Sequence, residues 1–131
     1  MKPLSGGCQC RAIRYNAAGP AVFSLQCCCR QCQRITGGGH ASQFAVPTDT
    51  FELAGQPAEF GLTADSGNAV VSAFCPRCGN PLFKRSTGHP QWVFVHAATL
   101  DDPSAYAPQR IVWHASAQPW DRLEPDLPRS P

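Results

Sequence analysis

Four of the eight cysteines in this 131-residue chain fall within six consecutive positions, 27 to 32. In an extended strand, side chains at i and i+2 share one face, so Cys27 and Cys29 point together and Cys28 points away. A C-x-x-C spacing can add Cys32 through a tight turn. We therefore expect Cys27, Cys29 and Cys32 to converge on one metal ion, with Cys28 as a buried or half-buried thiol outside the site.

Two further cysteine pairs have the spacing of metal ligands. Cys8 and Cys10 form a C-x-C, whose sulfurs again share a face. The segment Cys75-Pro76-Arg77-Cys78-Gly79 has the pattern of a zinc knuckle. In such a knuckle the proline presets the turn and the glycine accepts a positive φ without Cβ strain. In a reducing compartment, eight cysteines indicate metal ligands or reactive thiols more than disulfides.

Seven candidate ligands divide into four and three. A site with four cysteines is closed and structural, whereas three protein ligands leave the open position typical of catalytic zinc. Spacing leaves the pairing open, because the first C-x-C can join either the Cys75/Cys78 pair or the Cys27/Cys29 pair. Two alternatives stand beside an open zinc centre: every cysteine is structural in a scaffold that binds a partner, or the central thiols are redox-active.

The elements that position these cysteines are predicted to be short strands. The chain contains 13 Pro and 11 Gly, which divide it into short apolar runs rich in β-forming residues. We therefore predict an all-β domain of antiparallel strands. Helix is expected only for a turn or two after Cys29 and around Asp102 to Ala105, where an aspartate can cap and Pro103 suits the first turn. The predicted strands are 12–15, 21–26, 43–47, 58–62, 69–74, 92–97 and 109–113.

Composition narrows the function classes. The formal net charge is +2, and no run of like charges occurs, so we predict no nucleic-acid partner. The first residues do not form a secretory signal, and no run of about 18 apolar residues suggests a membrane span. We expect a cytoplasmic protein with one domain over residues 1–131, ending in a proline-rich arm, 121–131, that lies on the domain and frays past Pro128.

The three cysteine motifs, in this order, resemble the glutathione-dependent formaldehyde-activating enzyme family, which includes centromere protein V. The matching segments are Gly7-Cys8-Gln9-Cys10 with Ile13-Arg14-Tyr15, the Cys27/Cys29/Cys32 cluster with Gly37, and the run from Phe74 to Phe83. Leu100 to Pro103 and Trp113 through Pro119-Trp120 extend the likeness. It covers a core of about residues 6–120.

The resemblance implies a β-tent fold, related to the Mss4-like fold, with two zinc ions per chain. It assigns Cys8, Cys10, Cys75 and Cys78 to a structural zinc and Cys27, Cys29 and Cys32 to a catalytic zinc. The implied activity is that of a carbon–sulfur lyase, with glutathione and formaldehyde as partners and S-hydroxymethylglutathione as the adduct. The chain departs from the family pattern twice: Cys28 replaces a usual His, and Arg11 replaces a frequent Gly.

Several residues near the central cluster have two interpretations. Arg30 and Arg34 either offset the thiolate charge and hold substrate carboxylates or are ordinary surface residues. The run Gly37 to Gly39 either admits substrate to the metal or forms a turn. His40 is either a proton carrier or fourth ligand or an ordinary hydrogen-bonding residue. His96 is expected in the core, and Trp113 and Trp120 either wall a pocket or join the core.

Overall fold

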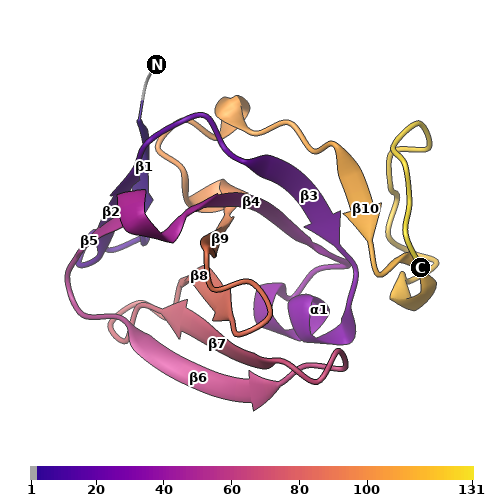
Figure 1. Cartoon of the computed structure of the whole chain (residues 1–131), viewed down its shortest axis with the longest axis horizontal. Coiled ribbons are helices and arrows are strands. Elements are labelled where there is room, and N and C mark those ends of the chain that lie inside the picture. The colour runs from indigo at the N-terminus through magenta and orange to yellow at the C-terminus, as the bar shows by residue number, and fades with distance from the viewer. Residues whose placement is uncertain (1–2) are drawn as a thin grey trace.

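The computed structural model describes residues 3–131 as two β-sheets (Figure 1). The smaller has the strand order β1-β2-β5 and the larger has the order β10-β3-β4-β9-β8-β7-β6. The small sheet consists of β1 (Leu4–Gly7), β2 (Arg14–Ala17) and β5 (Glu52–Ala54). The large sheet consists of β3 (Phe23–Cys27), β4 (Ala41–Pro47), β6 (Ala58–Thr63), β7 (Ala69–Phe74), β8 (Pro81–Ser86), β9 (Trp92–His96) and β10 (Arg110–Val112).

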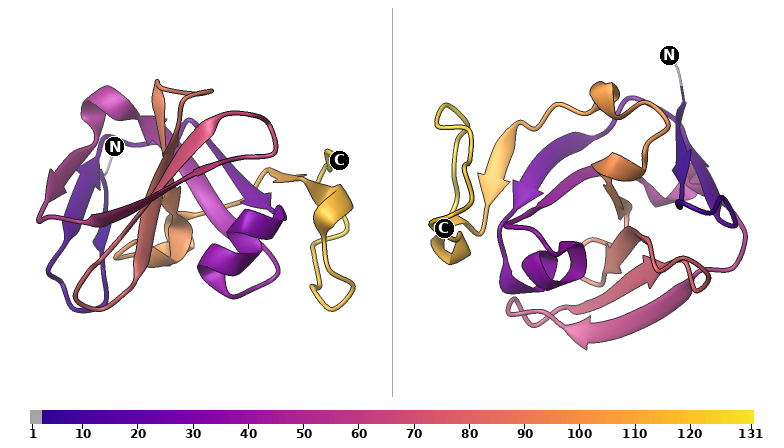
Figure 2. Two further views of the ribbon diagram at one scale, coloured as in Figure 1. Left: turned by 90° about the horizontal axis from the view of Figure 1, so that it is seen from below. Right: turned by 180° about the vertical axis from the view of Figure 1, so that it is seen from behind.

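The prediction of an all-β domain is confirmed, and each of the seven predicted runs overlaps a strand. Three strands were missed because β1 is half glycine, β5 has only three residues and β8 carries two adjacent cations. The expectation of purely antiparallel pairing is wrong at one place, since β10 lies parallel to β3. The two sheets lean together over a shared core, as Figure 2 shows, in agreement with the expected β-tent.

The large sheet uses its two faces differently because successive side chains of a strand alternate. One face, with Phe44, Val95 and Phe83, packs against Tyr15 of β2 and against Ile13, just before that strand, and forms the main core. On the opposite face, residues of β3, β4, β8 and β9 line a cavity. The sheet therefore separates the part of the protein that holds it together from the part that is open to small molecules.

The helical segments agree with the sequence signals. Helix α1 (Arg30–Thr36) begins directly after Cys29 and ends at Gly37, which takes a left-handed conformation with φ 75°. At a 3-10 turn, the Asp102 side chain accepts a hydrogen bond from the backbone of Ser104. The 3-10 turns are Thr48–Thr50, Ala97–Thr99, Pro103–Ala105 and His114–Ser116. No helix within residues 3–131 is long and apolar enough to cross a membrane.

The C-terminal arm is tied to the domain rather than frayed past Pro128. The backbone N–H of Ile111 donates to the Pro128 carbonyl at 2.9 Å, and that of Ser130 donates back to the Ile111 carbonyl at 2.9 Å. A further bond joins the His114 N–H to the Ser130 carbonyl. The arm thus covers the outer edge of β10, which would otherwise expose unpaired backbone groups.

Asp121 fixes the start of this arm at the glycine run. Its carboxylate lies 2.8 Å from His40 Nδ1, and its side chain packs directly on Gly39. A Cβ built on Gly39 would lie 2.3 Å from Asp121 Cγ, so only glycine allows this approach. The glycine run therefore provides, at Gly39, the space in which the C-terminal arm packs, whereas Gly37 ends the helix.

Replacing Gly39 with Ala should destabilise the protein by about 1–3 kcal/mol, since Asp121 must move and lose its bond to His40. Chemical denaturation would measure the change. Gly38→Ala is the matched control, because its Cβ would have no heavy-atom neighbour closer than 3.8 Å. Equal stability of both variants would contradict the proposed contact.

His96 is buried at the end of β9, as expected, with 8% of its surface exposed. Burial, together with the nearby charge of Lys84, lowers its pKa from 6.5 to about 4. Because the folded pKa lies below the unfolded one, this residue stabilises the fold fully above about pH 6.5. That stabilisation is lost as the pH falls through about 4.

The free energy of unfolding should therefore fall more steeply between pH 6.5 and 4 in the wild type than in His96→Leu. The difference should reach about 3 kcal/mol, from 1.36 kcal/mol for each tenfold change in proton affinity. Comparing the two proteins cancels acid effects on the cysteines, which both share. Parallel stability curves would show that His96 titrates normally in the folded state.

Candidate metal centres and adjoining cavity

The sulfurs of Cys8, Cys10, Cys75 and Cys78 lie within 4.8 Å of one another. The Cys8 and Cys10 sulfurs are 3.7 Å apart, as are those of Cys10 and Cys75. A disulfide would need about 2.05 Å, whereas sulfurs about 2.3 Å from a tetrahedral zinc ion are about 3.8 Å apart. The four sulfurs therefore fit a metal ion. The sequence left two pairings of the cysteine motifs open, and the structure shows the one that joins the first C-x-C with the Cys75/Cys78 pair.

Backbone amides support this four-cysteine cluster. The N–H of Ile13 donates to Cys8 Sγ at 3.3 Å, and those of Arg77 and Cys78 donate to Cys75 Sγ at 3.4 Å. A hydrogen bond from the backbone of Asn80 lowers the pKa of Cys78 to about 6. Such donors stabilise thiolates, which are the form that binds a metal.

Each motif of this cluster contains a left-handed residue. Gly79 has φ 78°, as the knuckle pattern predicted, and Arg11 has φ 67°. The left-handed conformation costs a residue with a Cβ about 1–2 kcal/mol. This cost is a physical reason for the frequent glycine that the resembled family has at the position of Arg11.

The second cluster joins Cys27, Cys29 and Cys32, again with sulfurs within 4.8 Å. Cys27 ends β3, Cys29 caps α1 in an extended conformation, and Cys32 lies in the first turn of that helix. The Cys32 N–H donates to Cys29 Sγ at 3.3 Å. Cys28 is fully buried outside the cluster, and its N–H donates to the Val112 carbonyl at 3.0 Å.

Hydrogen bonds and a nearby cation shift the pKa values in the three-cysteine cluster. Hydrogen bonds from the Cys27 and Cys32 thiols hold the pKa of Cys29 far below its usual value, and the same contact raises the pKa of Cys27. Lys84 Nζ lies 3.6 Å from Cys32 Sγ, and Gln43 Nε2 lies 3.7 Å from it. Burial alone would lower the pKa of Lys84, but the cysteines raise it overall, so this side chain stays cationic.

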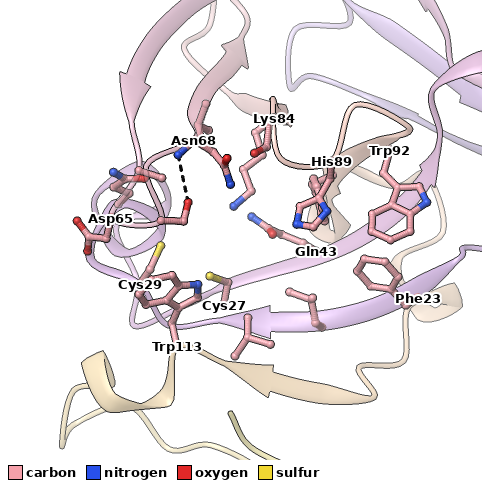
Figure 3. A pocket seen from close by; sticks show the side chains of 18 residues that line it. Phe23, Cys27, Cys29, Gln43, Asp65, Asn68, Lys84, His89, Trp92 and Trp113 are labelled. Atoms are coloured by element: carbon pink, nitrogen blue, oxygen red, sulfur yellow. Dashed lines mark hydrogen bonds between the residues drawn. The ribbon is translucent and has the colours of Figure 1, made fainter. Parts of the chain in front are cut away.

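A cavity of about 420 Å³ opens beside this cluster (Figure 3). Cys27 and Cys29 belong to its wall, together with Lys84 and Gln43. Trp113 closes one side from a left-handed backbone with φ 56°, an uncommon conformation for so large a residue. The three-cysteine cluster is thus accessible from a bounded space, whereas no cysteine of the four-cysteine cluster lines it.

Of the other residues that the sequence offered as site candidates, the structure places some at the cavity and others away from it. Arg30 and Arg34 are exposed and do not line the cavity, and His40 pairs with Asp121 instead of joining a cysteine cluster. Trp113 lines the cavity, whereas Trp120 is 64% exposed and belongs to neither cavity nor core.

Sequence reasoning missed Lys84 and Gln43, because only the sheet register brings β8 and β4 beside the cysteines. Gln43 pairs with Leu25 across β3 and β4, and Lys84 pairs with Phe94 across β8 and β9. Alternation within β4 and β8 can be read from the chain, but the pairing of these strands with β3 and β9 cannot.

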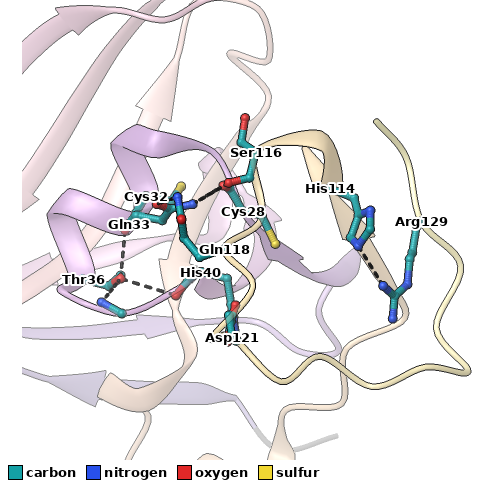
Figure 4. A network of polar contacts seen from close by, with 11 residues as sticks. Cys28, Cys32, Gln33, Thr36, His40, His114, Ser116, Gln118, Asp121 and Arg129 are labelled. Atoms are coloured by element: carbon teal, nitrogen blue, oxygen red, sulfur yellow. Dashed lines mark hydrogen bonds and ion pairs between the residues drawn. The ribbon is translucent and has the colours of Figure 1, made fainter.

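Gln33 was also missed, although it fixes the position of α1. Its buried amide donates to the Cys28 carbonyl at 2.8 Å and to the Ser116 carbonyl at 3.0 Å (Figure 4). Gln118 donates to its carbonyl oxygen at 3.2 Å. Through this amide the C-terminal segment is bonded to the stretch that carries the three-cysteine cluster.

We expect about two metal ions per chain in protein prepared under reducing conditions. Cys75→Ser should lose one ion and unfold, because Cys75 is a fully buried ligand and metal binding at this centre is coupled to folding. Cys29→Ser should also lose one ion yet keep its far-ultraviolet circular dichroism spectrum. Mass spectrometry of bound metal would test both, with Cys28→Ala as a control that retains two ions. Two ions in all three variants would contradict the assignment of ligands.

Comparison with known proteins agrees with this arrangement. A crystal structure of a Rhodobacter sphaeroides protein superimposes with a TM-score of 0.61 and 16% sequence identity, covering 75% of this chain and 88% of that one. At this identity the match supports the fold alone. The family described as glutathione-dependent formaldehyde-activating enzyme matches residues 3–116. The chain, with its two cysteine clusters, is therefore a member of the glutathione-dependent formaldehyde-activating enzyme family.

Proposed function

We propose that this protein is a zinc-dependent enzyme that makes or breaks the carbon–sulfur bond of thiol–aldehyde adducts, of which S-hydroxymethylglutathione is the family's example. One observation carries the proposal: a cluster of three cysteines, one short of a closed tetrahedral set, lies on the wall of a cavity with a cation beside it. The all-sulfur donor set favours zinc. The four-cysteine cluster has the complete ligand set of a structural centre.

The reaction moves negative charge between two atoms, the thiol sulfur and the aldehyde oxygen. In the forming direction the thiol sulfur bonds to the aldehyde carbon, the carbonyl electron pair moves to oxygen, and the thiol proton ends on that oxygen. The reverse breaks the carbon–sulfur bond and returns the electron pair to sulfur. Zinc, when bound, would supply a Lewis acid that favours the ionised thiol or polarises the aldehyde.

The chain's own residues hold this site in a charge-balanced state. Three thiolates around one divalent ion carry a formal charge of −1, and Lys84 at 3.6 Å from Cys32 Sγ offsets it. The same ammonium group can stabilise the negative charge that develops on sulfur or oxygen during the reaction. Gln43, which is 1% exposed, also points its amide at Cys32 Sγ and can keep the orientation of that side chain without being charged.

The alternative of a redox-responsive thiol protein loses its motivation here, since Cys28 is fully buried and outside the cluster. A scaffold without catalysis remains the alternative to the enzyme. A scaffold has no use for a cation beside an incomplete ligand set in a cavity. The cavity therefore favours catalysis, with a small thiol and an aldehyde as partners in a reducing, cytoplasmic setting.

Lys84→Met should slow the exchange between free formaldehyde and its glutathione adduct by roughly 100-fold, because it removes one preorganised charge and keeps the volume. Two-dimensional exchange spectroscopy would measure the rate, together with metal content. Arg85→Met is the matched control, since Arg85 is on the same strand but lies over the rings of Phe51 and Phe83. An exchange rate equal to that in buffer, for the wild type itself, would refute the proposed activity on this adduct.

A further inference from the structure

The end of the cavity away from the cysteines is a group of rings (Figure 3). Phe23 and Trp92 meet edge to face with centroids 4.9 Å apart, and His89 stacks on Trp92 at 5.4 Å. The Phe94 ring lies 6.0 Å from that of Phe23. The rings of Phe23, Trp92 and Phe94 offer an apolar, uncharged surface to a ligand.

This ring group and the cysteine cluster belong to the same cavity. Phe23, Leu25 and Cys27 alternate along β3 and all line it, so the space follows one face of one strand. Phe23 and Cys27 are four positions apart, a distance of about 13 Å in an extended strand. Leu25 lies between them, and Val112, which pairs with Cys27 across β10 and β3, adds apolar surface at the cysteine end.

The charges of the cavity do not match glutathione, which carries two carboxylates and an ammonium group. Among the residues that the structure describes, Lys84 is the one lysine or arginine that lines the cavity, and it faces the cysteine sulfurs. Asp65, at the β6–β7 loop, is the one carboxylate among the described lining residues. Arg30 and Arg34 lie outside, so a second substrate carboxylate would enter the cavity without a cationic partner.

We infer that the cavity takes adducts in which the thiol or the aldehyde carries a long apolar chain or a ring, in preference to glutathione. This rests on the proposed function for the reacting end. The sulfur or carbonyl group lies at the three-cysteine cluster, the chain runs along Leu25 and Val112, and its end contacts the rings of Phe23 and Trp92. Phe23 and Trp92 thereby determine specificity without touching the reacting atoms.

The test uses the full chain with its metal bound and a series of n-alkyl thiols from ethanethiol to decanethiol, with glutathione as comparison. Burial of each methylene is worth about 0.8 kcal/mol, so affinity should rise roughly fourfold per carbon. It should level off near about eight carbons, because a chain roughly 10 Å long then comes into van der Waals contact with the ring of Phe23, about 13 Å along the strand. Isothermal titration calorimetry would measure binding, with bound metal determined before and after.

Trp92→Ala should weaken octanethiol at least tenfold and leave ethanethiol unchanged, because only the longer chain reaches the ring. Trp120→Ala is the control: it removes an indole that is 64% exposed and does not line the cavity, so both affinities should stay the same. Phe23→Leu repeats the test with a smaller change in packing, should Trp92→Ala fail to fold. Thermal melting identifies the variants that fold, and only these are compared.

Glutathione binding as tightly as octanethiol, or Trp92→Ala weakening both thiols equally, would overturn the inference. Formaldehyde exchange, measured with the same thiols, separates the two proposals. Chain-length-dependent binding without accelerated exchange for any thiol refutes the proposed activity and keeps the apolar ligand. Accelerated exchange that is independent of chain length keeps the activity and overturns the apolar ligand.

Discussion

Thiolates held close together repel one another unless a cation lies among them, and this constraint governs the whole molecule. Seven of the eight cysteines gather into two clusters with sulfurs within 4.8 Å. In the four-cysteine cluster the ligands come from two turns that are 65 residues apart along the chain, as the Cys10–Cys75 contact shows. An ion held there would tie the N-terminal hairpin to the end of β7, so the attraction that neutralises the thiolates would also join the two sheets.

The three-cysteine cluster meets the constraint in a different way. It has fewer sulfurs, a neighbouring ammonium group and an opening to a cavity. The pleat of β3 makes this possible, because it points Cys27 into the cavity and Cys28 into the protein behind it. The large sheet therefore packs one face into the main core and turns the other toward the cavity beside the three-cysteine cluster.

The sequence predicted the parts of this arrangement that are local. The C-x-C and C-x-x-C spacings, the turn of Cys28 away from the cluster, the helix after Cys29 and the cap at Asp102 all follow from geometry within a few residues. The motif order was specific enough to indicate the family, which the match over residues 3–116 confirms. The pairing of the first and last motifs needed either that resemblance or the structure.

Features that depend on register between distant strands could not be predicted. Lys84 faces Cys32 because β8 pairs with β9 in one register, and a shift by one residue would bring Phe83 or Arg85 there instead. The ring group at Phe23 and Trp92 has the same origin, since these residues are 69 positions apart and meet only across the folded sheet. The tie through Gln33 likewise joins segments that are 83 residues apart.

The positions of two indoles in the cavity have an optical consequence. Trp113 lies beside Cys27 and Cys29, while Trp92 lies among the rings at the other end. Events at the cysteines and events at the apolar end therefore each have a native fluorophore close by, and the exposed Trp120 adds only a solvent-like background. The fluorescence of Trp113 can therefore report on metal binding at the cysteines, and that of Trp92 on ligand binding at the apolar end, without a label.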